Sequence, residues 1–118
     1  MGSPVVFFEV LGRDGAALRR FYTDLFEWRI DTMPEPMDYG MVAREEGGID
    51  GGVGTAPGGG RGHAIFYVHT DDPRGTLDRA SELGGSVVMP PLELPGGGVI
   101  ALLADPEGHT VGVYEPAR

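Results

Sequence analysis

The sequence lacks cysteine, lysine and any long apolar run. Without cysteine it can form no disulfide, thiolate nucleophile or cysteine-based zinc site. Nine basic residues stand against 18 Asp and Glu, which gives a net charge of −9, and this balance disfavours nucleic acid and anionic membrane surfaces as partners. No segment approaches the roughly 20 apolar residues of a membrane span, and residues 1–15 do not resemble a signal peptide. We therefore expect a cytoplasmic protein.

Glycine and proline are abundant, with 21 and 10 copies among 118 residues. Such a composition would suggest disorder if these residues were spread evenly. Instead they cluster between segments with clear apolar patterns, as turn residues do. A chain of this length can bury one core, so we expect a single domain over residues 1–118.

The first half of the sequence shows a strand, a helix and three further strands. Residues 5–11 are β-branched and aromatic, which is typical of a strand. Residues 14–26 carry apolar side chains at intervals of three and four, which predicts an amphipathic helix that Asp14 can cap. Short strands are expected near 27–32, 38–44 and 48–54.

The second half repeats this order. A strand is expected at 63–68, a helix capped by Asp72 ends near Gly84, and strands follow at 85–89, 98–104 and 110–115. Asp14 and Asp72 are 58 residues apart, about half the chain, as an internal duplication would produce. The predicted fold is α+β, with two βαβββ modules at about 4–56 and 62–116 and a glycine-rich linker at 57–61.

Three segments in this order resemble the vicinal oxygen chelate superfamily, which includes glyoxalases, bleomycin-resistance proteins and extradiol dioxygenases. They are FYTDLFEW at 21–28, GHAI at 62–65 and DPEGH at 105–109. The resemblance covers nearly the whole chain. It implies a curved, cup-shaped mixed sheet with helices on the outside, a small-molecule ligand in a cup at the module or dimer interface, and a homodimer.

Enzymes of this superfamily hold a divalent metal with His and Glu side chains from four strands. The resemblance places these four positions on Phe7, Asp50, His63 and Gly112, of which Asp50 rests on an uncertain alignment. Phe7 and Gly112 cannot bind a metal, and a catalytic metal normally needs at least three protein ligands. We therefore expect no metal at this site. The fallback is a rearranged metal set of His63, Glu9 and Asp50.

Glu9 is the main anomaly of its strand because its neighbours are apolar. It could serve as a general base or as the partner of a cationic ligand, or it could be a carboxylate in a salt bridge or at an exposed strand edge. His63 is expected to hydrogen-bond to Glu9, to Tyr67 or to a ligand. Tyr67 and His69 share the His63 face by strand alternation and either line the site or form an ordinary half-buried face.

Glycines in the 48–54 strand, with Gly112, remove side-chain volume and could leave room for a flat aromatic guest. Phe7 and Tyr39 would then line that space. Alternatively, these glycines only permit bulges and twist.

Two classes of function remain. In the first, the protein binds a small hydrophobic or aromatic molecule without metal, with Phe7, Glu9, Tyr39, Asp50, His63, Tyr67 and Gly112 lining the site. In the second it is an enzyme, a lyase, isomerase or dioxygenase, that uses a rearranged metal site or Glu9 and His63 as acid and base. The missing metal ligands favour the first, and a scaffold without a small-molecule role is the weakest alternative.

Overall fold

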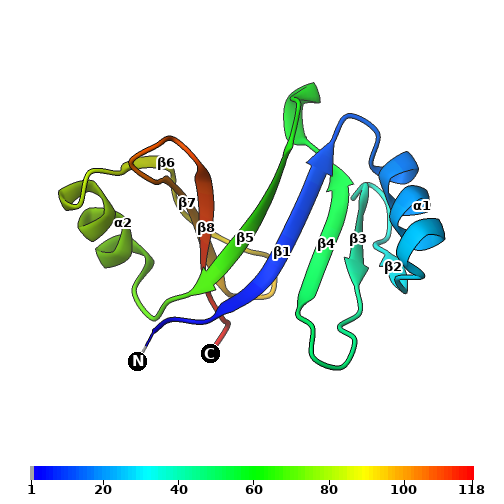
Figure 1. The fold of residues 1–118 in the computed structure, drawn as a ribbon, viewed down its shortest axis with the longest axis horizontal. Coiled ribbons are helices and arrows are strands. Elements are labelled where there is room, and N and C mark those ends of the chain that lie inside the picture. Colours follow the sequence, from blue (N-terminus) through cyan, green and yellow to red (C-terminus); the bar gives the residue numbers. More distant parts are fainter. Residues whose placement is uncertain (1) are drawn as a thin grey trace. The chain divides into compact units, whose positions relative to one another are not determined.

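The computed structural model describes residues 2–118, and these residues form two α-helices and eight strands in the order βαβββ, repeated twice (Figure 1). The first module comprises β1 (Val5–Gly12), α1 (Gly15–Phe26), β2 (Ile30–Thr32), β3 (Tyr39–Val42) and β4 (Asp50–Thr55). The second comprises β5 (His63–His69), α2 (Pro73–Glu82), β6 (Ser86–Glu93), β7 (Val99–Ala104) and β8 (Thr110–Glu115). A single 3-10 turn, Pro57–Gly59, lies in the expected linker. The predicted α+β class and the duplicated order are confirmed.

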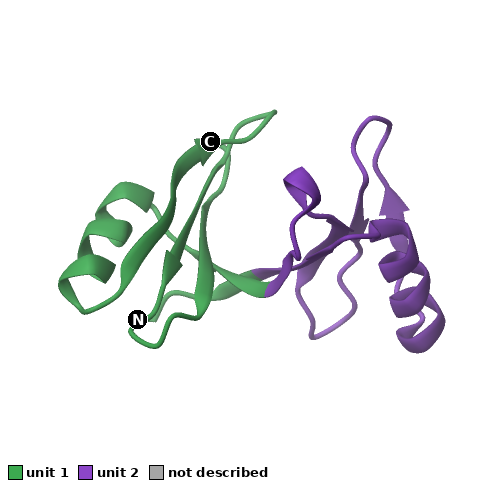
Figure 2. Ribbon diagram, turned by 90° about the horizontal axis from the view of Figure 1, so that it is seen from above, with its two compact units in different colours: residues 1–6, 65–118 green, residues 7–64 purple. Residues whose placement is uncertain are grey.

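The chain divides into two compact units, residues 7–64 and residues 1–6 with 65–118 (Figure 2). In the first unit the strand order is β2-β3-β4-β1, with β1 parallel to β4 and the other pairs antiparallel. In the second unit the order β6-β7-β8-β5 repeats this pattern, with β5 parallel to β8. Each module is thus a mixed sheet with one helix.

Both helices start at the aspartates that the sequence indicates. The Asp14 side chain accepts a hydrogen bond from the Ala17 amide, and Asp72 accepts one from Gly75, both at 3.0 Å. These caps satisfy amide groups that have no partner inside the first turn. Neither helix is long and apolar enough to cross a membrane, over the residues that the structure describes.

Each helix packs against its own sheet. In the second unit Leu77 of α2 is fully buried against Ala101 and Val113. In the first unit the rings of Phe8, Tyr22, Phe26 and Trp28 form a chain of contacts with centroids 5.2 to 6.1 Å apart. Strand alternation turns Phe8 to the face opposite Glu9, so this cluster belongs to the helix side of the sheet.

The expected strand boundaries differ most from the structure at β6. The strand near 85–89 extends to Glu93 and includes Pro90 and Pro91, which lie beyond its expected end. β6 is the edge strand of its sheet, and its register with β7 shifts twice. An edge strand tolerates proline because one side of its backbone has no ladder partner.

Candidate functional site

A polar cluster centred on Glu9 lies on the sheet face of residues 7–64. One Glu9 oxygen, Oε2, accepts a hydrogen bond of 2.9 Å from the Tyr39 hydroxyl. The other, Oε1, lies 2.8 Å from Nε2 of His63. The Glu9 side chain is 14% exposed and that of His63 is 24% exposed. The expected contact between Glu9 and His63 is therefore present, and the structure adds Tyr39 to it.

Tyr39 reaches Glu9 because two glycines leave its path open. Glu9 pairs with Gly52 across β1 and β4, and Tyr39 pairs with Gly54 across β3 and β4. A Cβ on Gly52 would overlap the Tyr39 hydroxyl, and one on Gly54 would lie 2.6 Å from the Tyr39 ring. The Tyr39 ring therefore packs across β4 against the backbone of these glycines, with its hydroxyl next to the Glu9 carboxylate.

Aromatic rings cover strand glycines at two other places in the chain. The Phe8 ring covers Gly51, and the Tyr67 ring covers Gly112, its register partner on β8. The expectation that these glycines leave space for a ligand is thus wrong at Gly51, Gly52, Gly54 and Gly112, because the protein's own rings occupy that space.

The strand that carries Tyr39 is held from the helix side. Arg19 on α1 donates to the Val53 carbonyl at 3.1 Å and to Asp38 at 2.7 Å. The Thr55 hydroxyl donates to the second oxygen of Asp38 at 2.6 Å, and the Thr55 amide donates to the Asp38 carbonyl at 2.9 Å. The pKa of Asp38 is held below its usual 3.8. The main cause is the hydrogen bond from the Thr55 hydroxyl, and the next is the hydrogen bond from the Arg19 guanidinium. The residue immediately before Tyr39 is thereby anchored.

The other candidate residues are distributed between the units. Phe7 and Asp50 are register partners on β1 and β4, in the same unit as Glu9, and Asp50 is exposed. Tyr67 and Gly112 belong to the other unit, where Tyr67 is 4% exposed. The cluster of residues 7–64 therefore consists of Glu9, Tyr39 and His63.

The donor set does not fit a divalent metal. Phe7 and Gly112, two of the four positions that the resemblance implies, have no ligand atom. Within residues 2–118 no three His, Asp or Glu side chains are grouped so that they could hold a metal ion. The fallback set of His63, Glu9 and Asp50 is not assembled.

A family model described as a glyoxalase-like domain matches residues 6–114. The chain belongs to this family. It is 29% identical over 89% of its length to CFP32 of Mycobacterium bovis, which carries the name of a suspected glyoxylase, and 30% identical over 96% to the anthracycline biosynthesis protein DnrV of Streptomyces peucetius. It spans only 42% and 46% of those two proteins.

Solved structures support the same fold. A member of the glyoxalase, bleomycin resistance protein and dioxygenase superfamily from Vibrio splendidus 12B01 aligns with a TM-score of 0.66 and 13% identity. The alignment covers 98% of this chain and all of that one. The resemblance drawn from the three sequence segments is therefore confirmed at the level of family and fold.

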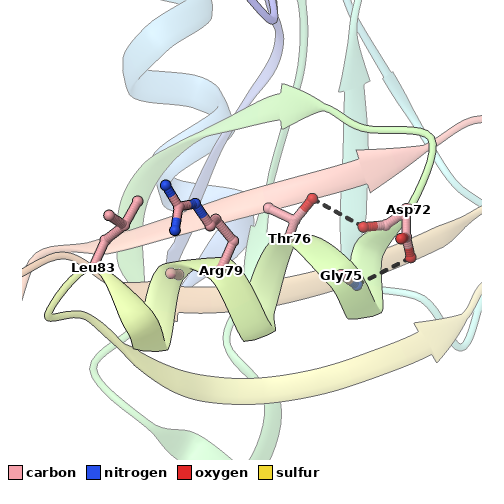
Figure 3. Close-up of a pocket in the computed structure, with 6 residues that line it drawn as sticks. Asp72, Gly75, Thr76, Arg79 and Leu83 are labelled. Carbon is pink, nitrogen blue, oxygen red and sulfur yellow. Dashed lines mark hydrogen bonds between the residues drawn. The ribbon is translucent and has the colours of Figure 1, made fainter.

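A second feature of this glyoxalase-like domain is an open surface hollow of about 490 Å³ along α2 (Figure 3). It is lined by Asp72, Gly75, Thr76, Arg79, Ala80 and Leu83. Asp72 accepts bonds there from the Gly75 amide and, at its carbonyl, from the Thr76 hydroxyl at 2.9 Å. These groups cap the helix, so part of the lining is already engaged in helix capping.

Sequence reasoning missed the anchor formed by Arg19, Asp38 and Thr55. Arg19 is one of the polar residues that lie between the apolar positions of α1. The available signal was Gly40 in the middle of β3, where a Cβ would lie 2.6 Å from the Arg19 side chain. A glycine inside a strand marks a place where another group approaches closely.

Proposed function

We propose that this domain binds a small aromatic or hydrophobic molecule at the Glu9 face of residues 7–64, without a metal, and that the polar cluster orients a polar group of that ligand. The observation that carries the proposal is the position of Glu9. It is the one charged residue of an otherwise apolar strand, 14% exposed, with Tyr39 and His63 on its two oxygens. A partly buried carboxylate held in this way is preorganised for recognition.

The ligand class is supported by the surroundings of the cluster and by one relative. Phe7 and Met41 alternate onto the same face as Glu9 and Tyr39, which gives the polar cluster apolar neighbours. DnrV is named for anthracycline biosynthesis, and anthracyclines are planar polycyclic phenols. A flat ring system with a hydroxyl group matches both observations.

The test is titration with 2-hydroxyanthraquinone, followed by quenching of the protein's intrinsic fluorescence and checked by equilibrium dialysis. We expect saturable one-to-one binding that Glu9→Gln weakens about tenfold or more, as expected for loss of a hydrogen bond to a charged group. His109→Gln is the matched control, because its side chain is 73% exposed and pairs with the turn residue Asp105. Absence of saturable binding, or equal binding by Glu9→Gln, would contradict the proposal.

The second candidate function is acid–base catalysis without metal. The 2.8 Å contact between a carboxylate and an imidazole favours it, because such pairs move protons in many enzymes. The test is whether chelator-treated protein exchanges a carbon-bound proton of a ketone or hemithioacetal substrate for deuterium in D2O, as followed by NMR. Loss of exchange in His63→Gln would support catalysis, and exchange equal to the buffer blank would reject it for those substrates.

We further propose that the protein forms a homodimer, the assembly implied by the resemblance to two-module members of the superfamily. Light scattering should give about twice the chain mass of 12.5 kDa at micromolar concentration. A mass of one chain at all accessible concentrations would contradict this assembly.

A further inference from the structure

His63 presents its two ring nitrogens differently. Nε2 is committed to Glu9 at 2.8 Å, which leaves Nδ1 as the nitrogen that can meet a ligand. Within residues 2–118 no buried side-chain nitrogen or oxygen lacks a hydrogen-bond partner. No hydrogen bond to Nδ1 is present among these residues, so Nδ1 is not buried, and a ligand can reach it on a ring that is 24% exposed.

The bond to Glu9 also sets where the ring proton sits. An ionised carboxylate has no proton to donate and can only accept, and Oε2 of Glu9 already accepts from the Tyr39 hydroxyl. Nε2 must therefore carry the proton in its bond to Oε1. In a neutral imidazole the other nitrogen then holds a lone pair, so Nδ1 is an acceptor.

The bonds within the cluster assign the two residues their roles. Both oxygens of Glu9 are engaged, by Tyr39 and by His63, whereas His63 has a second ring nitrogen outside the bond to Glu9. A carboxylate behind a histidine fixes its tautomer and orientation and stabilises the imidazolium when the outer nitrogen takes a proton.

We propose that Nδ1 of His63 is the proton acceptor of this site, with Glu9 as its positioning residue, and that the site takes ligands with a weakly acidic hydroxyl, a phenol or an enol. This rests on the proposed function and names the ligand class. In the transfer, the ligand O–H bond breaks and an Nδ1–H bond forms. The imidazolium is paired with Glu9, and the phenolate or enolate stays bound beside it.

The first test needs no ligand. Two-dimensional ¹⁵N–¹H NMR distinguishes the two neutral tautomers, and His69→Gln and His109→Gln assign the three histidines. We expect His63 to be protonated at Nε2 in the wild type, and Glu9→Gln to produce a mixture, because an amide can donate as well as accept. Tyr39→Phe is the control, since it keeps Glu9 and should keep the tautomer. An Nδ1-protonated His63 in the wild type would overturn the inference.

The second test compares 2-hydroxyanthraquinone with 2-methoxyanthraquinone, which has the same ring system and no acidic proton. At fixed neutral pH we expect the bound hydroxyl compound to show the visible absorption of its ionised form. His63→Gln should lower the ratio of ionised to neutral bound hydroxyl compound about tenfold, whereas the matched control His109→Gln, in an exposed turn, should leave that ratio and the binding of both compounds unchanged.

The outcomes separate the two proposals. If neither quinone binds, the proposed function fails for this ligand class, and the tautomer measurement still decides the role of His63. If both bind and the hydroxyl compound stays neutral in the wild type, the proposed function stands and His63 is not the proton acceptor.

Discussion

Replacement of Gly52 by alanine tests whether the Tyr39 ring packs against the glycine backbone of β4. The new methyl group would overlap the Tyr39 hydroxyl and would lie 2.6 Å from the Cε2 atom of the ring. The overlap involves the edge of a ring that is held at both ends, by its backbone on β3 and by its hydroxyl on Glu9. A shift of a few tenths of an ångström cannot remove it.

The cost follows from the two ways in which the protein can respond. If Tyr39 stays, the overpacked contact costs about 1–3 kcal/mol. If the ring swings away, it loses its hydrogen bond to a charged group, which costs a similar 1.5–3 kcal/mol. These are alternatives and do not add. Alanine regains about 0.5–1 kcal/mol because it has less conformational freedom to lose than glycine, so we expect a net destabilisation of about 1–2 kcal/mol.

The assay is urea unfolding followed by circular dichroism, in a double-mutant cycle with Tyr39→Ala. In the Tyr39→Ala background the methyl group meets no ring, so Gly52→Ala should be neutral or slightly stabilising, which gives a coupling of about 2 kcal/mol. Gly60→Ala is the matched control, because its Cβ would lie an ordinary 3.6 Å from the nearest atom. If Gly52→Ala is as benign as Gly60→Ala in the wild type, Tyr39 does not cover β4 and the description of the site is wrong.

Three further expectations concern the rest of the chain. The lowered pKa of Asp38 means that its contacts with Thr55 and Arg19 stabilise the fold fully above about pH 4 and are lost as pH falls through the lower folded-state value, so Asp38→Asn should flatten the acid side of the stability profile. A parallel wild-type and variant profile would contradict this. Leu77→Ala should cost about 2–5 kcal/mol because Leu77 is fully buried, whereas Leu83→Ala, at a position 62% exposed, should cost little, and equal losses would refute the assigned core. Treatment with a chelator should leave both the free energy of unfolding and quinone binding unchanged. Elemental analysis of the untreated protein is the second measurement, and a stoichiometric divalent metal that is lost in His63→Gln would show a metal site.

The sequence was sufficient to predict the elements because their signals are local. Apolar periodicity defined both helices and all eight strands to within a few residues, and Asp14 and Asp72 marked the helix starts. The end of β6 was misjudged because Pro90 and Pro91 look like loop residues. Whether a strand tolerates proline depends on its place in the sheet, and a single sequence does not report which strand lies at the edge.

The site was only partly predictable because it depends on register. Glu9 stood out in its own strand, and the predicted contact with His63 followed from the strand order of the family. That Tyr39 would cover Gly52 and Gly54 depends on how β3 pairs with β4, and shifting that pairing by one residue would turn Tyr39 to the other face. The glycines signalled a close approach without saying whether a ligand or the protein's own ring makes it.

The duplication explains why Glu9 and the Tyr39 ring that covers its glycine partner both belong to the first module. Glu9 and Tyr67 are equivalent, since each pairs with a glycine on the parallel fourth strand of its module, Gly52 and Gly112. In the second module Tyr67 covers its own glycine partner. In the first module a carboxylate occupies that position, and the covering ring comes instead from Tyr39 on β3. Moving the aromatic group to a neighbouring strand keeps the glycine covered and supplies a hydroxyl donor to the carboxylate. A Glu9→Tyr variant would therefore place two rings over one glycine, so we expect this substitution to destabilise the first module although the same residue is native at the equivalent position of the second.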